Sequence, residues 1–567
     1  MSDAAHGPLG FLRKENIVAP EGYNRWRVPP ASITIHLCIG SVYAWSVFNP
    51  ALTRELGVVT SSGSDWTLSS VVWIFSVAIV VLGLAAAFGG KWLEKVGPRY
   101  VGVVAASLWG GGFLIGSAGI ATHQLWMVYL GYGVFGGAGL GLGYVSPVST
   151  LIRWFPDRRG MATGMAIMGF GGGAMIGAPL KQWLLNLYQT APDFLGAAGA
   201  VTLVTEGGRR FAETAAGKVE VVVASAQQAA VFGGEAGVYV VGTGNTGAAA
   251  TFATLGVVYF CVMVFAAFQY RVPRDGWKPE GWEPKPVASG MVTRNNVHID
   301  QALKTPQFWL LWVVLCFNVT AGIGVIGVAK TMINEIFGDL ALVTAAFAGT
   351  YVLMISVFNM VGRFFWASTS DFIGRKNTYH CFFIIGTILY CTIPFWAASG
   401  GLTALVGFYI ATMIIFTMYG GGFATIPAYL ADIFGTMHVG GIHGRLLTAW
   451  STAGVLGPFA ITYLRNISTE NAIADLASAV DPAAFVEKFG APVSQLGDLV
   501  AANTVTIAGL MDLAPAGTVD PTATLYNTTM YCMAALLVIA FFANLMVRPV
   551  RDHHHVDNTH PEAVPAE

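Results

Sequence analysis

An internal repeat constrains the fold of this chain more strongly than any other feature of its sequence. Three positions of the first half recur about 280 residues later: Pro147 as Pro427, Phe155 as Phe434 and Pro179 as Pro458. The basic turn at residues 90–99 recurs in the same way at residues 371–375. A nearly constant offset over such a length indicates a duplicated unit. Because both copies lie among long apolar runs, the sequence predicts two similar halves embedded in a membrane.

The composition supports a membrane protein with many helices. Of the 567 residues, 54% are hydrophobic and 11% are charged, whereas about 25% of residues are charged in an average soluble domain. Glycine lets membrane helices approach closely and tryptophan prefers the interfaces, which fits the 69 glycines and 16 tryptophans. The net charge of −1 gives no reason to expect a nucleic-acid partner. The six cysteines show neither a disulfide framework nor metal-ligand spacing, so we expect no metal and no cofactor.

Twelve apolar segments are long enough to cross a bilayer, because about 20 apolar residues span about 30 Å of hydrocarbon. These segments are 32–50, 67–89, 100–120, 125–151, 161–187, 252–270, 307–331, 342–367, 378–398, 403–431, 445–464 and 525–547. The predicted fold class is an all-α polytopic membrane protein, with twelve transmembrane helices in two six-helix bundles and two extended extracytoplasmic loops.

The spans and the polar segments that separate them predict five parts of the chain. These are a cytoplasmic N-terminal segment at 1–31, a first bundle at 32–270 with an outer insertion at 188–251, a cytoplasmic linker at 271–306, a second bundle at 307–547 with an outer insertion at 465–524, and a cytoplasmic tail at 548–567. Lys and Arg concentrate in the short loops on the side of the termini, so we expect both termini in the cytoplasm and the chain in the cell inner (plasma) membrane. The insertion at 188–251 contains strand-like residues 219–223 and 238–241, and the insertion at 465–524 is predicted to be partly helical.

The repeated turns carry glycine and charged residues at matching places. They are Gly90, Glu94, Gly97 and Arg99 after the second span, and Asp371, Gly374 and Arg375 after the eighth. Glycine permits a tight turn, and the acidic residue can pair with a helix N-terminus or a cation. A simple basic turn would explain one such motif, but two at matching positions favour a latch between moving halves.

These turns resemble the signature loops of the major facilitator superfamily. The resemblance continues through residues 40–50, 141–147, 154–164, 168–173, 359–366 and 425–432, which are similar to the oxalate/formate antiporter family. It covers all twelve spans but neither insertion. The resemblance implies a secondary transporter of small carboxylates that works by alternating access, and we expect it to act as a monomer.

Arg363 is predicted to lie deep inside the eighth span, about 12 Å from the turn at Asp371. An arginine at this depth costs at least about 2.5–3.5 kcal/mol. Backbone carbonyls, Asn359 or a structural carboxylate could offset that cost, but we find no Asp or Glu deep inside any span. We therefore favour a carboxylate ligand, which the guanidinium fits in a bidentate manner. The resemblance agrees, because the arginine of this motif binds substrate in the oxalate/formate family.

Aromatic residues are the expected walls of the site. Tyr43, Tyr144, Tyr419 and Trp450 each offer an apolar body and one donor, although packing or an interfacial position would explain each of them individually. Oxalate-exchanging relatives carry a second cation, a lysine, in span 11, and residues 446–458 here contain none. We therefore expect a monocarboxylate such as formate, lactate or pyruvate in preference to oxalate.

The coupling mechanism is predicted less directly. Proton-driven transporters commonly use Asp or Glu relays inside the membrane, and their absence here favours anion exchange. His36 on the first span could carry a proton, since histidine titrates near neutrality, although a structural histidine is the more common case. Oxalate/formate antiport and proton-coupled monocarboxylate symport therefore remain alternatives.

Two other function classes fit the sequence less well. A membrane-embedded carboxylate sensor would need a partner-binding element on the cytoplasmic side, and neither the linker nor the tail contains a recognisable one. The spans contain no HExxH motif, no GxSxG motif and no paired carboxylates, so we expect no enzymatic activity. The expected partners are a small organic anion and the lipid bilayer.

Overall fold

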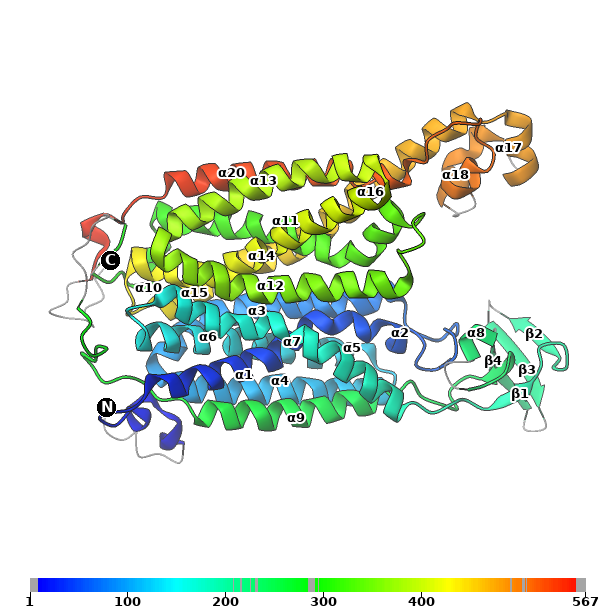
Figure 1. The fold of residues 1–567 in the computed structure, drawn as a ribbon. Helices are drawn as coiled ribbons and strands as arrows, with labels where there is room; N and C mark the ends of the chain where they lie inside the picture. Colours follow the sequence, from blue (N-terminus) through cyan, green and yellow to red (C-terminus); the bar gives the residue numbers. More distant parts are fainter. Residues whose placement is uncertain are drawn as a thin grey trace. The chain divides into compact units, whose positions relative to one another are not determined.

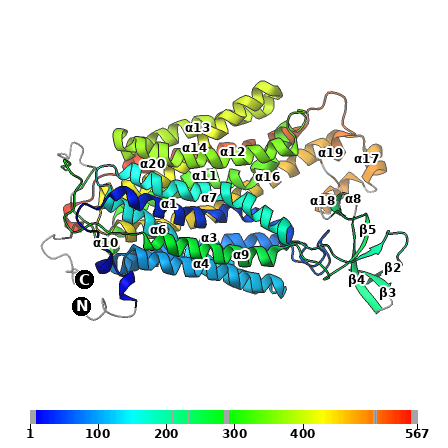
Figure 2. The ribbon, with the colours of Figure 1, turned by 60° about the horizontal axis from the view of Figure 1, so that its bottom comes forward.

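The computed structural model of this chain is mostly helical, with one small sheet (Figures 1 and 2). It describes residues 9–206, 209–214, 217–224, 226–229, 233–283, 291–293, 295–489, 492–501, 505 and 507–556. Parts of the predicted N-terminal segment, linker and tail lie outside the described residues, namely 1–8, 284–290 and 557–567.

The chain forms two compact units, which we describe separately. Unit 1 comprises Met1–Phe308, Ala424–Ser451 and Pro549–Glu567, and unit 2 comprises Trp309–Phe423 and Thr452–Arg548. The boundaries between the units fall within three helices, which are those of the seventh, tenth and eleventh spans. Each of these spans contributes one end to unit 1 and the rest to unit 2.

Unit 1 contains the six spans of the first half. Four of them are single helices: α3 (Leu68–Val96), α4 (Pro98–Ala121), α7 (Arg159–Tyr188) and α9 (Ala248–Phe268). The first span is interrupted, and consists of α1 (Val28–Gly40), a 3-10 segment η4 (Ser41–Val47) and α2 (Asn49–Leu52). The fourth span consists of α5 (Leu125–Val128), a π-helical segment η5 (Tyr129–Gly136) and α6 (Gly137–Trp154).

Short elements cover the end of unit 1 at which the described chain begins and ends. They are η1 (Gly10–Leu12), η2 (Lys14–Ile17), η3 (Arg25–Arg27), α10 (Ile299–Ala302), α15 (Val439–Leu446) and η9 (Asp552–His554). His555 of the tail pairs with Val297 of the linker in an isolated antiparallel bridge. The described parts of the predicted linker and tail therefore lie at this end, which we call the linker side.

The sheet of unit 1 lies at its opposite end (Figure 1). It has five antiparallel strands in the order β1-β5-β4-β3-β2: β1 (Phe194–Gly196), β2 (Leu203–Glu206), β3 (Arg209–Thr214), β4 (Gly217–Ala224) and β5 (Gly237–Val240), with α8 (Ala226–Ala229) beside them. Alternate valines of β4 face opposite sides, since Val222 packs with Tyr239 and Val221 packs with Val238. The strand-like segments predicted in this insertion are confirmed.

Unit 2 holds the greater part of the second half. Its elements are α11 (Pro306–Phe337), α12 (Ala345–Ile373), α13 (Arg375–Ser399), α14 (Gly401–Phe434), α16 (Thr448–Ala479), α17 (Pro482–Phe489), η7 (Val493–Gln495), α18 (Leu496–Ala501), α19 (Ile507–Met511), η8 (Pro521–Thr524) and α20 (Asn527–Met546). Helix α16 continues well past residue 465, where the sequence suggested that the outer insertion starts.

Glycines of the repeated turns end one helix and start the next in both copies. Gly97 has φ +91 between α3 and α4, and Gly374 has φ +85 between α12 and α13. This left-handed backbone favours glycine over residues with a side chain. Pro98 then begins α4 at a position where its missing N–H costs nothing.

Ten helices in the described part of the chain are long and apolar enough to cross a membrane. The first and eleventh spans are not among them. The first span is interrupted at η4, and the eleventh begins with α15 and continues as α16 after Leu447. Together with these two interrupted spans, the ten helices agree with the predicted twelve-helix fold.

Candidate functional site

Three of the predicted aromatic residues meet in unit 1. Tyr43 lies on η4, Tyr144 on α6 and Trp450 near the start of α16. The ring centroid of Trp450 is 6.2 Å from that of Tyr43 and 5.3 Å from that of Tyr144. Phe170 of α7 packs against all three rings, at centroid distances of 5.2, 5.3 and 5.4 Å. We call these four residues the aromatic cluster. Each residue comes from a different span, and the faces of their rings are suited to contact with a small flat ligand.

Two buried histidines contact the ring of Tyr144. His36 of α1 lies 5.1 Å from it and His443 of α15 lies 5.9 Å from it, centroid to centroid. The His36 Nε2 lies 3.1 Å from the carbonyl oxygen of Tyr144, and its Nδ1 contacts the carbonyl oxygen of Ala166. Neither ring nitrogen of His443 has a hydrogen-bond partner within the described residues. His443 was missed by the sequence analysis, which placed the start of span 11 at residue 445.

A buried lysine holds the interruption of the first span. Lys181 of α7 is fully buried, and its ammonium donates to the carbonyl oxygens of Ser41 at 2.7 Å and Ala44 at 3.3 Å. The ammonium also lies 4.8 Å from the ring centroid of Phe48. These carbonyls belong to η4, so Lys181 fixes the backbone on which Tyr43 is carried.

In unit 2, α12 and α14 bring together Arg363, Asn359 and Tyr419. Arg363 is fully buried, and its Nε donates to the Asn359 side-chain oxygen at 3.0 Å. Its guanidinium lies 5.3 Å from the ring centroid of Phe423, which packs against Tyr419 at 5.4 Å. A side chain at Gly420 would collide with the backbone of Asn359, so glycine permits the close approach of the two helices here.

The turn after the second span is part of a charged network on the linker side of unit 1. We give the name linker-side network to Lys91, Glu94, His298, Asp300, His438 and Arg445. Glu94 lies 2.9 Å from the His438 Nδ1 and accepts from the Gly441 amide at 3.2 Å, at the start of α15. Asp300 of α10 accepts from Lys91 at 3.1 Å and from Arg445 at 2.5 Å.

Charges in this network shift two pKa values. Burial alone would raise the pKa of Asp300, but hydrogen bonds and charge from Arg445 and Lys91 outweigh it and lower the pKa to about 2. Burial, and then the charge of His438, lowers the pKa of His298. Asp300 therefore remains a carboxylate and His298 remains largely neutral near neutral pH.

The remaining turn residues have other contacts. Arg99 donates to the carbonyl oxygens of Phe11, Phe268 and Tyr270, so it ties the N-terminal segment to the end of α9. A side chain at Gly90 would collide with the backbone of Gly440. Glycine at this position therefore permits the close packing of α3 on α15. In the second copy, Arg375 donates to Asp371 within the same turn at 2.6 Å.

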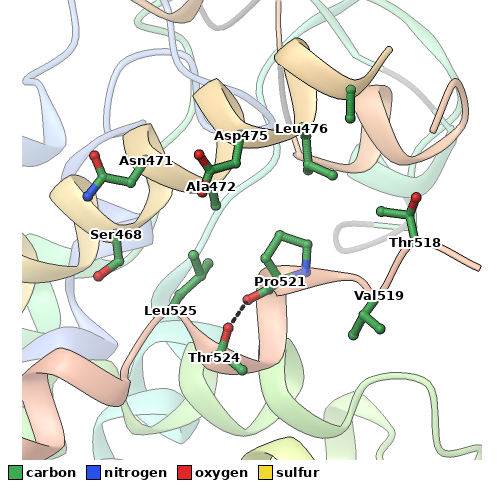
Figure 3. Close-up of a pocket in the computed structure, with 11 residues that line it drawn as sticks. Ser468, Asn471, Ala472, Asp475, Leu476, Thr518, Val519, Pro521, Thr524 and Leu525 are labelled. Atoms are coloured by element: carbon green, nitrogen blue, oxygen red, sulfur yellow. Dashed lines mark hydrogen bonds between the residues drawn. The ribbon is translucent and has the colours of Figure 1, made fainter. Parts of the chain in front are cut away.

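The described residues also line two cavities, one in each unit. One of about 2090 Å³ in unit 1 is lined by the linker-side network except Arg445, and by neighbouring basic residues such as Arg13 and Lys95. Another of about 490 Å³ in unit 2 lies between the end of α16 and the segment around η8, where Asn471 and Asp475 face Thr524 and Pro521 (Figure 3). The cavity in unit 2 contains none of the predicted site residues.

Comparisons with known proteins agree with this architecture. The family description "Major Facilitator Superfamily" matches residues 32–205. The oxalate:formate antiporter of Oxalobacter formigenes is 26% identical over 438 residues, which cover 76% of this chain and 83% of that protein. Apicoplast pyruvate carrier 1 of Toxoplasma gondii is 24% identical over 498 residues, which cover 78% and 84%. The outward conformation of the transporter FucP, 12% identical, gives a TM-score of 0.54 over 92% of this chain and 100% of that one.

The chain is similar to the major facilitator superfamily over residues 32–205, and its fold is like that of solved members of this superfamily. It is a multi-pass membrane transporter with the twelve-helix fold of that superfamily, as predicted, and it resembles the oxalate/formate antiporters.

The predicted site residues fall into two sets, one in each unit. Tyr43, Tyr144, Trp450 and His36 lie together in unit 1, and Arg363, Asn359 and Tyr419 lie together in unit 2. Sequence reasoning missed Lys181 and the linker residue Asp300. Lys181 could have been found, because it is a lysine inside a predicted span, but Asp300 carries no signal in a polar linker.

Proposed function

We propose that this transporter carries small monocarboxylates, such as formate, lactate or pyruvate, by alternating access. The buried guanidinium of Arg363 is the observation that carries the proposal. Its planar donor fork fits a carboxylate with two parallel hydrogen bonds. Asn359 is a neutral partner on the same helix face, so it orients the fork through Nε without supplying a negative charge.

The aromatic cluster of unit 1 supports a small, flat ligand. Tyr144 and Trp450 are buried and carry donor groups on apolar rings. The named activities of two relatives, an oxalate:formate antiporter and a pyruvate carrier, point to the same class of substrate. Residues 446–458 of span 11 contain no lysine or arginine, which favours one carboxylate over two.

The distribution of Lys and Arg along the chain supports a proposal for the membrane orientation of the transporter. We place the transporter as a monomer in the cell inner membrane with both termini in the cytoplasm, since Lys and Arg concentrate on the linker side. Exchange of one anion for another is the simplest cycle for a carrier without acidic residues deep in its predicted spans, and His36 offers proton symport as the second candidate.

Counterflow in liposomes tests the substrate. Purified protein, preloaded with unlabelled pyruvate, is offered labelled formate, acetate, lactate, pyruvate or oxalate in turn. Pyruvate and lactate should exchange well and oxalate poorly. Equal rates for oxalate and pyruvate would contradict the preference for one carboxylate.

Arg363→Gln and Arg363→Lys test the site. Hydrogen bonds to charged groups contribute about 1.5–3 kcal/mol each, so Arg363→Gln should weaken pyruvate binding by at least roughly tenfold. Arg363→Lys keeps the charge without the fork and should retain part of the activity. Melting temperature in detergent shows whether each variant is folded; a folded Arg363→Gln protein that exchanges pyruvate normally would remove Arg363 from the site.

A further inference from the structure

The cavity of about 2090 Å³ on the linker side of unit 1 has a basic lining. Seven lysine and arginine side chains line it, against four carboxylates, and five histidines add further nitrogen atoms. The lysines and arginines are Arg13, Lys14, Lys91, Lys95, Arg153, Arg159 and Arg274. Common small-molecule sites have volumes of roughly 300–1,000 Å³, so this cavity has room for a large, highly charged ligand.

Part of this positive charge is not used by the protein itself. Two of the four carboxylates, Glu94 and Asp300, are already bound within the linker-side network. Arg13 and Lys95 line the cavity and make no ion pair within the described residues. The cavity therefore offers an ammonium and a guanidinium group to an anion from solution.

Histidines of the tail add to this positive environment. Burial, and then the charges of His553 and Arg551, lowers the pKa of His554. Neither ring nitrogen of His555 has a hydrogen-bond partner within the described residues, although its side chain is only 11% exposed. All three histidines line the cavity. An anion beside these rings would offset the neighbouring positive charges and supply hydrogen-bond acceptors.

The same cavity presents an aromatic ring with no aromatic partner. Trp277 and Trp282 of the linker both line it. The ring of Trp277 packs edge-on against Trp154, with the centroids 4.8 Å apart. Trp282 is half-buried and makes no ring contact within the described residues. Its indole can therefore accept a flat aromatic group by stacking.

We propose that this cavity binds a nucleoside polyphosphate. Arg13 and Lys95 bind the phosphate oxygens through charge-assisted hydrogen bonds, and the base stacks on Trp282. The N-terminal segment, the linker and the tail each form part of the cavity wall, so the bound nucleotide joins these three segments of unit 1. None of the residues proposed to bind the carboxylate lines this cavity, so the inference does not depend on the proposed function.

The first test measures the binding of labelled ATP to the purified full-length protein in detergent. ATP should bind, and its affinity should fall as salt is added, because salt screens exposed charges. Arg13→Gln/Lys95→Gln should weaken ATP binding by roughly tenfold or more. Arg27→Gln/Lys278→Gln is the matched control, because it removes two exposed charges on the linker side that do not line the cavity. Equal ATP affinities for the two double variants would overturn the inference.

The second test separates the base from the phosphates. Inorganic tripolyphosphate should bind less tightly than ATP, and adenosine should not bind measurably. Trp282→Ala should weaken ATP binding by roughly tenfold and leave tripolyphosphate binding unchanged. Tripolyphosphate that binds as tightly as ATP, with no effect of Trp282→Ala, would overturn the nucleotide assignment. Displacement of ATP by pyruvate would identify the cavity as the mouth of the transport path and would overturn it as well.

The third test uses the wild-type protein alone, so it does not require a variant to fold. ATP should slow hydrogen exchange of the amides in residues 13–18, 296–301 and 553–556, which contribute to the three walls of the cavity. Wild-type protein that exchanges pyruvate in liposomes but neither binds ATP nor shows this protection would overturn the inference and leave the proposed function standing. Protein that binds ATP but exchanges no carboxylate would instead overturn the proposed function and support the nucleotide site.

Discussion

Lys181 provides a direct test of how the interrupted first span is held. We consider Lys181→Met, which keeps most of the apolar stem of the lysine but removes its ammonium. The change breaks hydrogen bonds to the carbonyls of Ser41 and Ala44 and the contact with the ring of Phe48. It leaves two carbonyl oxygens of η4 without this donor inside the bundle.

The magnitude follows from opposing terms. Two hydrogen bonds to a charged group contribute about 1.5–3 kcal/mol each, and a desolvated cation–π contact contributes about 2 kcal/mol. The variant no longer buries a charge, and this removes a desolvation penalty of several kcal/mol and so stabilises the fold. We therefore expect a net destabilisation of about 1–3 kcal/mol, far below the sum of the contacts, because the two terms largely cancel.

The assay is thermal unfolding in detergent, followed by intrinsic tryptophan fluorescence. At about 2–4 °C per kcal/mol, Lys181→Met should lower Tm by several degrees. Lys330→Met, an exposed lysine of α11, is the matched control and should change stability by less than about 0.5 kcal/mol. If both variants unfold at the wild-type temperature, Lys181 does not support η4 and the reasoning is refuted.

Two further predictions concern the two ends of unit 1. Burial raises the pKa of Glu55 from 4.5 to about 7, so wild-type stability should fall as pH rises from 4.5 to 7. Glu55→Gln should match the wild type near pH 4.5 and exceed its Tm at pH 8 by the equivalent of up to about 3 kcal/mol. A difference in Tm that is constant at all pH values would show that ionisation of Glu55 is not the cause. Glu94→Gln should speed hydrogen exchange of the amides of Val439–Leu446 by roughly tenfold or more. The reason is that the variant loses the charge-assisted hydrogen bonds of Glu94 to His438 and Gly441, which contribute about 1.5–3 kcal/mol each. Asp371→Asn is the matched change in the other copy and should leave amide exchange in α15 unchanged.

The sequence predicted the helices of this chain better than its buried polar groups. Apolar runs and repeated turns are sufficient to indicate twelve spans, because bilayer thickness sets the length of each one. The end of a helix depends on packing, and this is why α15 begins at Val439 and includes His443 while the apolar run starts later. His443 was missed for that reason alone.

Lys181 shows a different limit of the sequence analysis. The rule that drew attention to Arg363 applies equally to a lysine inside a predicted span, but the sequence does not reveal that α1 stops at Gly40 and exposes carbonyl groups. Close contact of Gly40 with the backbone of Phe170 brings α1 and α7 together at this point. The partners of Lys181 therefore exist only because two distant segments pack, which no local pattern records.

The two copies of the repeat keep the same turns but use them differently. In the first copy Glu94 reaches His438 and the Gly441 amide at the start of α15, whereas in the second copy Asp371 is bound by Arg375 of its own turn. The Arg375–Asp371 contact stays within one turn, whereas the contacts of Glu94 join α3 to α15 within unit 1.

The buried basic residues have diverged in the same way as the turns. Lys181 of unit 1 donates to two backbone carbonyl oxygens, whereas Arg363 of unit 2 donates to a side-chain amide oxygen. A carbonyl contact fixes the backbone and leaves the positive charge in place, because a neutral dipole does not cancel it. Under the proposed function, an anion that reaches the aromatic cluster therefore meets positive charge held by the first half itself. Such a charge favours the binding of a carboxylate at this place in unit 1.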